Sequence, residues 1–185
     1  MESSKPVGLV CATSRRDSTS MKVLRCYEQI LQQRHGVLTE VFDLEQLPAD
    51  FLTAVLYQSS RSSHPQWQVW QQKLDYLEHF VFVIPEYSGS YPGILKAFVD
   101  AMAYPRSLQG KKTSMVGLSD GTQGAALAMA HFADVLNYAG ALTLPLRPRL
   151  IQINRYMEGE NLVHEPYQRL LEQHADAFMA LGRPF

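Results

Sequence analysis

The chain has 185 residues, 46% of them hydrophobic, so it can bury one sizeable core but is too short for two ordinary domains. Its 17 Lys and Arg residues nearly balance its 18 Asp and Glu residues, which favours neither nucleic acid nor a membrane surface as a partner. The sequence shows no signal-peptide pattern and no apolar stretch long enough to span a membrane. We therefore expect one domain over residues 1–185, a cytoplasmic location and a small-molecule ligand.

The first half of the chain alternates predicted strands and helices. Residues 7–12 are an apolar run typical of a buried strand, and residues 20–34 place Val23, Tyr27 and Leu31 at helical spacing. Residues 38–43 alternate polar and apolar side chains, which favours a strand near a sheet edge. After a short turn, residues 49–63 end in a serine-rich run that predicts an irregular surface segment before a helix over 65–77.

The second half of the chain begins with its most apolar segment, residues 80–84. Uninterrupted apolar residues suit a strand covered on both faces, so this strand belongs at the centre of a parallel sheet. A helix over 93–103, a strand over 113–118, a helix over 124–139 and a strand over 141–146 follow; an irregular stretch then precedes a helix over 165–181. This alternation predicts an α/β fold with a doubly wound, five-stranded parallel sheet and helices on both faces.

The loop after the first predicted strand contains no glycine, so it does not match a dinucleotide-binding or nucleoside-triphosphate loop. It instead carries Arg15 and precedes a helix whose free amides and dipole favour an anion, which suits a terminal monophosphate. Ser18 or Ser20 could alternatively serve only as a helix cap. The hydroxyl-bearing residues of this loop are Thr13, Ser14, Ser18, Thr19 and Ser20.

Two further loops follow predicted strands. Pro85, Glu86, Tyr87, Ser88 and Gly89 come directly after the central strand, and Ser119 and Gly121 come after the next one. Either loop alone could be an ordinary polar turn. In a flavodoxin-like strand order, 2-1-3-4-5, all three loops meet around one cleft at the carboxyl edge of the sheet. Their agreement is what predicts a ligand site.

These residues resemble a known family. Thr13-Ser14-Arg15 with Ser18 and Ser20, then the Pro-Glu-Tyr and Pro-Gly-x-Leu-Lys motifs of residues 85–96, then Ser119, Gly121 and Gly124, are similar to the NADPH-dependent FMN reductases, which are flavodoxin-like flavoproteins. The resemblance spans nearly the whole chain, and residues 85–96 are its most specific part. Ala12, Ser20 and Ser88 depart from the glycine, asparagine and asparagine common in the family.

The resemblance implies FMN as cofactor, with NADPH or NADH as co-substrate. It implies that the first loop holds the FMN phosphate, the second lies along the isoalloxazine ring, and the third closes the cleft. A small acceptor such as a flavin or quinone, and a homodimer or homotetramer, are also implied. The expected cofactor-binding residues are Thr13, Ser14, Arg15, Ser18, Thr19, Ser20, Pro85, Glu86, Tyr87, Ser88, Gly89, Ser119 and Gly121.

We therefore expect an FMN-containing oxidoreductase that passes a hydride from NAD(P)H to a small acceptor. Such chemistry needs no catalytic acid or base from the protein, and we assign none. Two alternatives are a non-catalytic flavin-binding electron carrier and, given Ala12 and Ser88, a scaffold that has lost the cofactor. Metal-ligand spacings and a Gly-x-Ser-x-Gly elbow are absent from the sequence, and Cys11 and Cys26 suggest buried hydrophobes.

Overall fold

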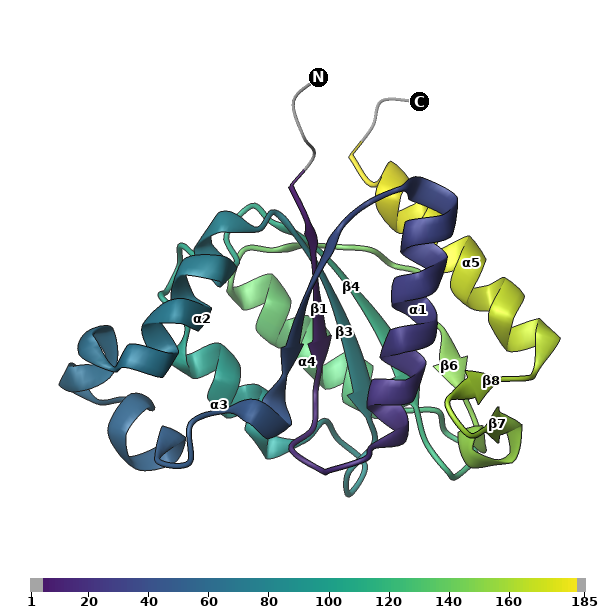
Figure 1. Ribbon diagram of the computed structural model, residues 1–185, viewed down its shortest axis with the longest axis horizontal. Coiled ribbons are helices and arrows are strands. Elements are labelled where there is room, and N and C mark those ends of the chain that lie inside the picture. Colours follow the sequence, from purple (N-terminus) through teal and green to yellow (C-terminus); the bar gives the residue numbers. More distant parts are fainter. Residues whose placement is uncertain (1–4, 183–185) are drawn as a thin grey trace.

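The computed structural model describes residues 5–182 of the chain. A parallel sheet forms its middle layer (Figure 1). The strands β1 (Val7–Cys11), β2 (Thr39–Asp43), β3 (His79–Pro85), β4 (Lys112–Leu118) and β5 (Leu142–Thr143) run in the order β2-β1-β3-β4-β5. The flavodoxin-like order predicted from the sequence is confirmed.

The apolar run over residues 80–84 lies at the centre of the sheet, as predicted. β3 pairs in parallel with β1 on one side and with β4 on the other, so that Val81 lies opposite both Leu9 and Ser114. All five residues of the run are fully buried. A strand with helices on both faces has no solvent-facing side, which explains why no polar residue alternates within it.

The predicted fifth strand over residues 141–146 is only partly correct. Two short strands, β5 and β6 (Arg149–Leu150), both pair with β4, β5 at its amino end and β6 at its carboxyl end. Pro145 and Pro148 lie between them, and proline cannot donate to a strand ladder. The chain therefore leaves the sheet and returns to it six residues later in register with Gly117.

Helices cover both faces of the sheet. On one face lie α1 (Thr19–His35) and α5 (Glu165–Ala180), and on the other lie α2 (Pro65–Tyr76), α3 (Gly93–Ala101) and α4 (Ala126–Tyr138) (Figure 1). In the layer formed by α1 and α5, the buried Tyr27 hydroxyl and His174 Nδ1 are 2.7 Å apart. On the other face, Phe98 and Met102 of the α3 segment are buried in the core.

Short elements fill the segments that read as irregular. A 3-10 helix, η1 (Leu44–Gln46), follows β2 directly. The segment over residues 49–63 contains a single π-helical turn, η2 (Phe51–Val55), and a second 3-10 helix, η3 (Ser59–Ser63). After β6 come η4 (Ile153–Tyr156) and a small hairpin of β7 (Met157–Glu158) and β8 (Asn161–Leu162). Within residues 5–182, no helix is both long and apolar enough to cross a membrane.

Candidate functional site

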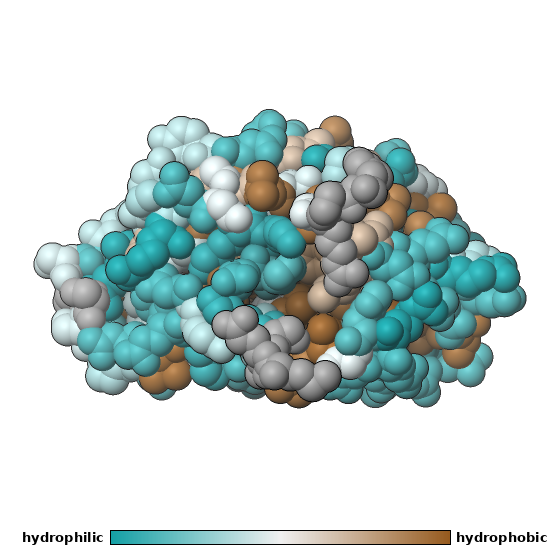
Figure 2. Space-filling model, turned by 90° about the horizontal axis from the view of Figure 1, so that it is seen from above, coloured by the Kyte–Doolittle hydropathy of each residue, from teal (hydrophilic) through white to brown (hydrophobic). Residues whose placement is uncertain are grey.

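The carboxyl ends of β1, β3 and β4 meet at the lower edge of the sheet in Figure 1, and the loops that follow them converge there. Figure 2 views the opposite edge, where most of the visible surface is hydrophilic. A hollow of about 240 Å³ opens among the three loops. It is lined by Arg15, Arg16, Asp17, Ser18, Thr19, Ser20, Pro85, Glu86, Tyr87, Leu118, Ser119, Asp120, Ile153 and Asn154.

The first loop joins β1 to α1 and ends in a helix cap. Ser18 is the N-cap of α1, and its hydroxyl accepts a hydrogen bond from the Met21 amide at 3.2 Å. The capping role left open by the sequence is therefore real for Ser18. The amides of Thr19 and Ser20, in the first turn, donate to no protein acceptor within residues 5–182. Free amides at a helix N-terminus, together with the helix dipole, favour an anion at this point.

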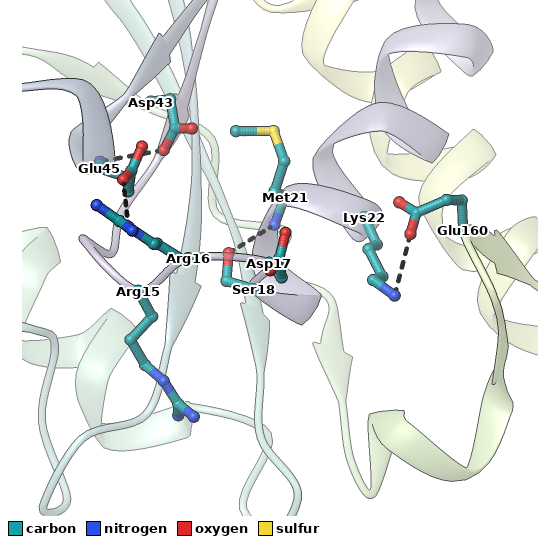
Figure 3. A pocket seen from close by; sticks show the side chains of 9 residues that line it. All are labelled: Arg15, Arg16, Asp17, Ser18, Met21, Lys22, Asp43, Glu45 and Glu160. Atoms are coloured by element: carbon teal, nitrogen blue, oxygen red, sulfur yellow. Dashed lines mark hydrogen bonds and ion pairs between the residues drawn. The ribbon is translucent and has the colours of Figure 1, made fainter.

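The arginines of the first loop are oriented differently (Figure 3). Arg16 pairs with Glu45 at 3.1 Å, in a neighbouring hollow of about 520 Å³, where Lys22 also pairs with Glu160 at 3.0 Å. The Arg15 side chain points away from these carboxylates, and within residues 5–182 its guanidinium has no acidic partner. Arg15 is thus the cation of this loop that is free to meet an anion.

The second loop makes a tight turn at the end of β3. Tyr87 and Ser90 exchange backbone hydrogen bonds of 2.8 and 2.9 Å, and the two residues between them, Ser88 and Gly89, have φ angles of 50° and 74°. Positive φ at both central positions is the geometry of a type I′ turn, which favours Asn-Gly or Gly at these positions. Apart from its two chain neighbours, no atom of residues 5–182 lies within 4 Å of a Cβ atom added to Gly89, so this side of the turn faces open space.

Side chains of the second loop reach both other loops. The Tyr87 hydroxyl lies 2.5 Å from Thr13 Oγ1, and the Glu86 carboxylate accepts a hydrogen bond from the Ala125 amide at 3.0 Å. In the third loop, Ser119 Oγ accepts from the Gly124 amide at 2.9 Å and donates to the Gly121 carbonyl at 3.1 Å. The three loops therefore form one hydrogen-bonded unit around the hollow.

Titratable groups near the loops offer no activated nucleophile. Burial raises the pKa of the Cys11 thiol to about 11, so this thiol stays protonated at neutral pH. Burial likewise raises the pKa of Asp43, on β2 beside the first loop. Within residues 5–182, no group of three or more His, Cys, Asp or Glu side chains is arranged to hold a metal ion. The site can bind and orient a ligand through hydroxyls, amides and Arg15.

The structure brings together most of the residues that the sequence singled out. Eight of them line the hollow: Arg15, Ser18, Thr19, Ser20, Pro85, Glu86, Tyr87 and Ser119. Five do not line it directly: Thr13, which is buried behind Tyr87, and Ser14, Ser88, Gly89 and Gly121.

Six further residues that line the hollow were not predicted from the sequence: Arg16, Asp17, Leu118, Asp120, Ile153 and Asn154. Asp120 lies within the third loop and could have been found there. Asn154 comes from η4, and its side-chain oxygen accepts a hydrogen bond from the Thr19 hydroxyl at 2.8 Å. No local pattern marks Asn154, because it reaches the site only through the pairing of β6 with β4.

A strand order of this kind, with a ligand hollow at the carboxyl edge, defines a flavodoxin-like α/β protein. Solved structures agree. The flavoenzyme NAD(P)H:(acceptor) oxidoreductase FerB from Paracoccus denitrificans superposes with a TM-score of 0.75, at 24% identity, over 95% of each chain. The apo form of the NADH:FMN oxidoreductase EmoB superposes with a TM-score of 0.76, at 16% identity, over 98% of this chain and 92% of the other.

The family follows from the sequence comparison. The model of the NADPH-dependent FMN reductases matches residues 6–148, and the chain belongs to this family of FMN-dependent oxidoreductases that use NAD(P)H as electron donor. A 2-hydroxy-1,4-benzoquinone reductase from a Burkholderia species is 26% identical over 63% of this chain and 66% of its own length. An NADH:(hydroxy)cinnamate reductase subunit, CrdA, from Vibrio ruber is 23% identical over 82% of this chain and 70% of its own length.

Proposed function

We propose that the hollow at the carboxyl edge of the sheet binds FMN, and that the protein passes a hydride from NAD(P)H through this flavin to a small acceptor. The observation that carries the proposal is the convergence of three linked loops on one hollow in a member of the FMN reductase family. When bound, FMN supplies the hydride chemistry. The protein supplies binding, orientation and exclusion of water.

The residues present fit this cofactor. Arg15 and the free amides of Thr19 and Ser20 offer a charged and a neutral set of donors to the terminal phosphate. The turn at Ser88 and Gly89 leaves open space on its outer side for a flat ring. In this proposal Ser18 and Ser20, which line the hollow, supply hydroxyls near the phosphate; Ser14 contributes to the loop beside them, and Thr13 acts through Tyr87. Ser119 and Gly121 form the far wall.

We propose a small quinone as the acceptor class. A quinone reductase and a (hydroxy)cinnamate reductase subunit are among the relatives, and both act on small organic molecules by name. A formal net charge of −1 argues against the alternative of an electron carrier that recognises a protein partner through a strong field. Turnover of NADPH against a panel of quinones, free flavins and ferric complexes would rank the acceptors.

We further propose a homodimer or homotetramer in the cytoplasm, where reduced nicotinamide is supplied. Phe98 and Met102, of the apolar α3 segment, are buried within the subunit and do not support this assembly. Support comes from Tyr104 and Tyr138, whose rings stack at 6.2 Å although they are 70% and 81% exposed. Exposed apolar groups of this kind favour an interface. A single monomer in sedimentation at micromolar concentration would end the assembly proposal.

An absorbance spectrum tests the main proposal. We expect the purified protein to show visible flavin absorption, alone or after FMN is added and excess is removed. Anaerobic NADPH should then bleach it, and a quinone should restore it. Flavin that is bound but not bleached by NADPH would favour the electron-carrier alternative, and failure to bind FMN would favour the scaffold that has lost its cofactor.

A further inference from the structure

The helix α4 begins at a residue that cannot cap it. Its N-cap position is Ala125, which has φ 60° and ψ 28° and makes no side-chain capping hydrogen bond. A helix N-terminus leaves several amides without an intrahelical partner, and a Ser, Thr, Asp or Asn at this position usually satisfies one of them. Here Glu86, 39 residues earlier in the chain, accepts a hydrogen bond from the amide of Ala125 itself at 3.0 Å, as the glutamate of a capping box does.

Glu86 is itself held in place. Its amide donates to the Leu118 carbonyl at 3.1 Å, and the preceding Pro85 is paired with Leu118 in the β3–β4 ladder. The carboxylate is therefore fixed at the ends of two neighbouring strands. A negative charge at a helix N-terminus is also favoured by the helix dipole.

The segment between β4 and α4 is anchored along its length. Ser119 holds the Gly124 amide and the Gly121 carbonyl, and the Gln152 amide donates to Gly121 from the other side at 3.0 Å. The contact between Glu86 and Ala125 fixes its last residue. Because Glu86 and Ser119 both line the hollow, this contact sets how far apart two walls of the site lie.

We propose that Glu86 is a positioning residue of the flavin site, with two separable effects. Its hydrogen bond caps α4 from a different loop of the same chain. The same contact holds residues 119–125 as a preformed wall for the flavin. Its negative charge, beside the site, disfavours electron uptake and lowers the midpoint potential of the bound flavin. The wall for the flavin and the effect on its potential rest on the proposed function, whereas the cap of α4 does not.

Two substitutions separate these effects. Glu86→Gln keeps an acceptor oxygen and removes the charge, whereas Glu86→Ala removes both. Glu172→Gln is the matched control, because Glu172 is a half-exposed glutamate that faces Arg34 between α5 and α1, away from the hollow. Hydrogen–deuterium exchange over residues 119–128 of the apoprotein reports the cap, FMN titration reports affinity, and a spectroelectrochemical titration reports the potential.

In Glu86→Ala we expect faster exchange over residues 119–128 and a roughly tenfold weaker FMN affinity, as for loss of a charge-assisted hydrogen bond. In Glu86→Gln we expect near-parental exchange and affinity but a more positive midpoint potential. Glu172→Gln should leave all three unchanged.

Parental exchange and affinity in Glu86→Ala would overturn the capping role, and an unshifted potential in Glu86→Gln would overturn the electrostatic one. If Glu86→Ala does not fold, faster exchange in Glu86→Asp, whose shorter side chain cannot reach Ala125, decides the capping role instead. If the parent binds no FMN, the proposed function fails, while the exchange measurement still decides whether Glu86 caps α4.

Discussion

The hydroxyl groups of Thr13 and Tyr87 lie 2.5 Å apart, and this contact joins the loop after β1 to the loop after β3. Thr13 is buried, and its Oγ1 also accepts a hydrogen bond from the Arg15 amide at 3.2 Å. The link therefore connects the tyrosine of the second loop to the backbone that presents Arg15. The phosphate end and the ring end of the proposed site are coupled through two side chains.

Tyr87→Phe should loosen this coupling without removing the aromatic ring. Loss of one neutral hydrogen bond is expected to weaken FMN binding by about 1 kcal/mol, or roughly fivefold. Isothermal titration of the apoprotein with FMN measures the change. Tyr76→Phe is the control, because Tyr76 is 56% exposed and lies at the end of α2 beside Lys5, away from the hollow. Equal FMN affinities in Tyr87→Phe and the parent would show that the Tyr87 hydroxyl does not contribute to flavin binding.

Arg15→Ala should weaken FMN binding by about 1.5–3 kcal/mol, because a charge-assisted contact to the phosphate is lost. Riboflavin, which has no phosphate, should bind the variant and the parent alike. Arg25→Ala serves as the matched control, since Arg25 is paired with Glu28 on α1 and does not line the hollow. Equal losses for FMN and riboflavin would show that Arg15 does not meet the phosphate.

Gly89→Val should abolish flavin retention while the sheet stays folded. The reason is backbone conformation, because φ is 74° at Gly89 and a β-branched residue is strained there, although space for a Cβ exists. Normal FMN binding by a folded Gly89→Val protein would contradict the placement of the ring along this turn.

Ser88→Asn should relieve backbone strain in the same turn, since asparagine tolerates the φ of 50° at that position better than serine. We expect a modest gain in thermal stability for Ser88→Asn and parental flavin binding.

Acid should destabilise the protein through His174. Burial lowers the pKa of His174 to about 4 in the folded protein, against an ordinary value of 6.5. Its contribution to stability is fully present above about pH 6.5, and it is lost as the pH falls toward 4, because the unfolded chain takes up the proton first. The shift corresponds to roughly 3 kcal/mol. Urea unfolding at a series of pH values should show this component in the parent and not in His174→Gln; an equal pH dependence in both would assign the acid sensitivity elsewhere.

The fold could be predicted from the sequence wherever a segment's own composition decides its environment. The apolar run of residues 80–84 indicated a central strand, and β3 is that strand. The prediction over residues 141–146 was only partly correct, because the strand β5 is short and a second short strand, β6, pairs with β4 only after two prolines. Which short segment fills a sheet position depends on its partner strand rather than on its own pattern.

The same distinction applies to the hollow. Arg15, Tyr87 and Ser119 lie directly after strands, so parallel topology alone brings them together. Asn154 depends on the β6 pairing, and the capping contact of Glu86 depends on the backbone conformation of Ala125. Such contacts are set by the assembled backbone and leave no signal in the local sequence.

The two sides of the hollow differ in how much room their backbone has to move. A Cβ atom on Gly117 would lie 2.6 Å from the Gly124 carbonyl oxygen, so the end of β4 and the third loop touch backbone to backbone. That side is stiff, whereas a Cβ atom added to Gly89, at the tip of the turn, would lie more than 4 Å from every atom of residues 5–182 other than its own chain neighbours. A nicotinamide and an acceptor have to enter and leave the proposed site one after the other. The turn at residues 87–90 is then the part that moves during this exchange, and the β4 side stays fixed. Substitutions that stiffen residues 87–90 should therefore slow ligand exchange more than they change equilibrium affinity.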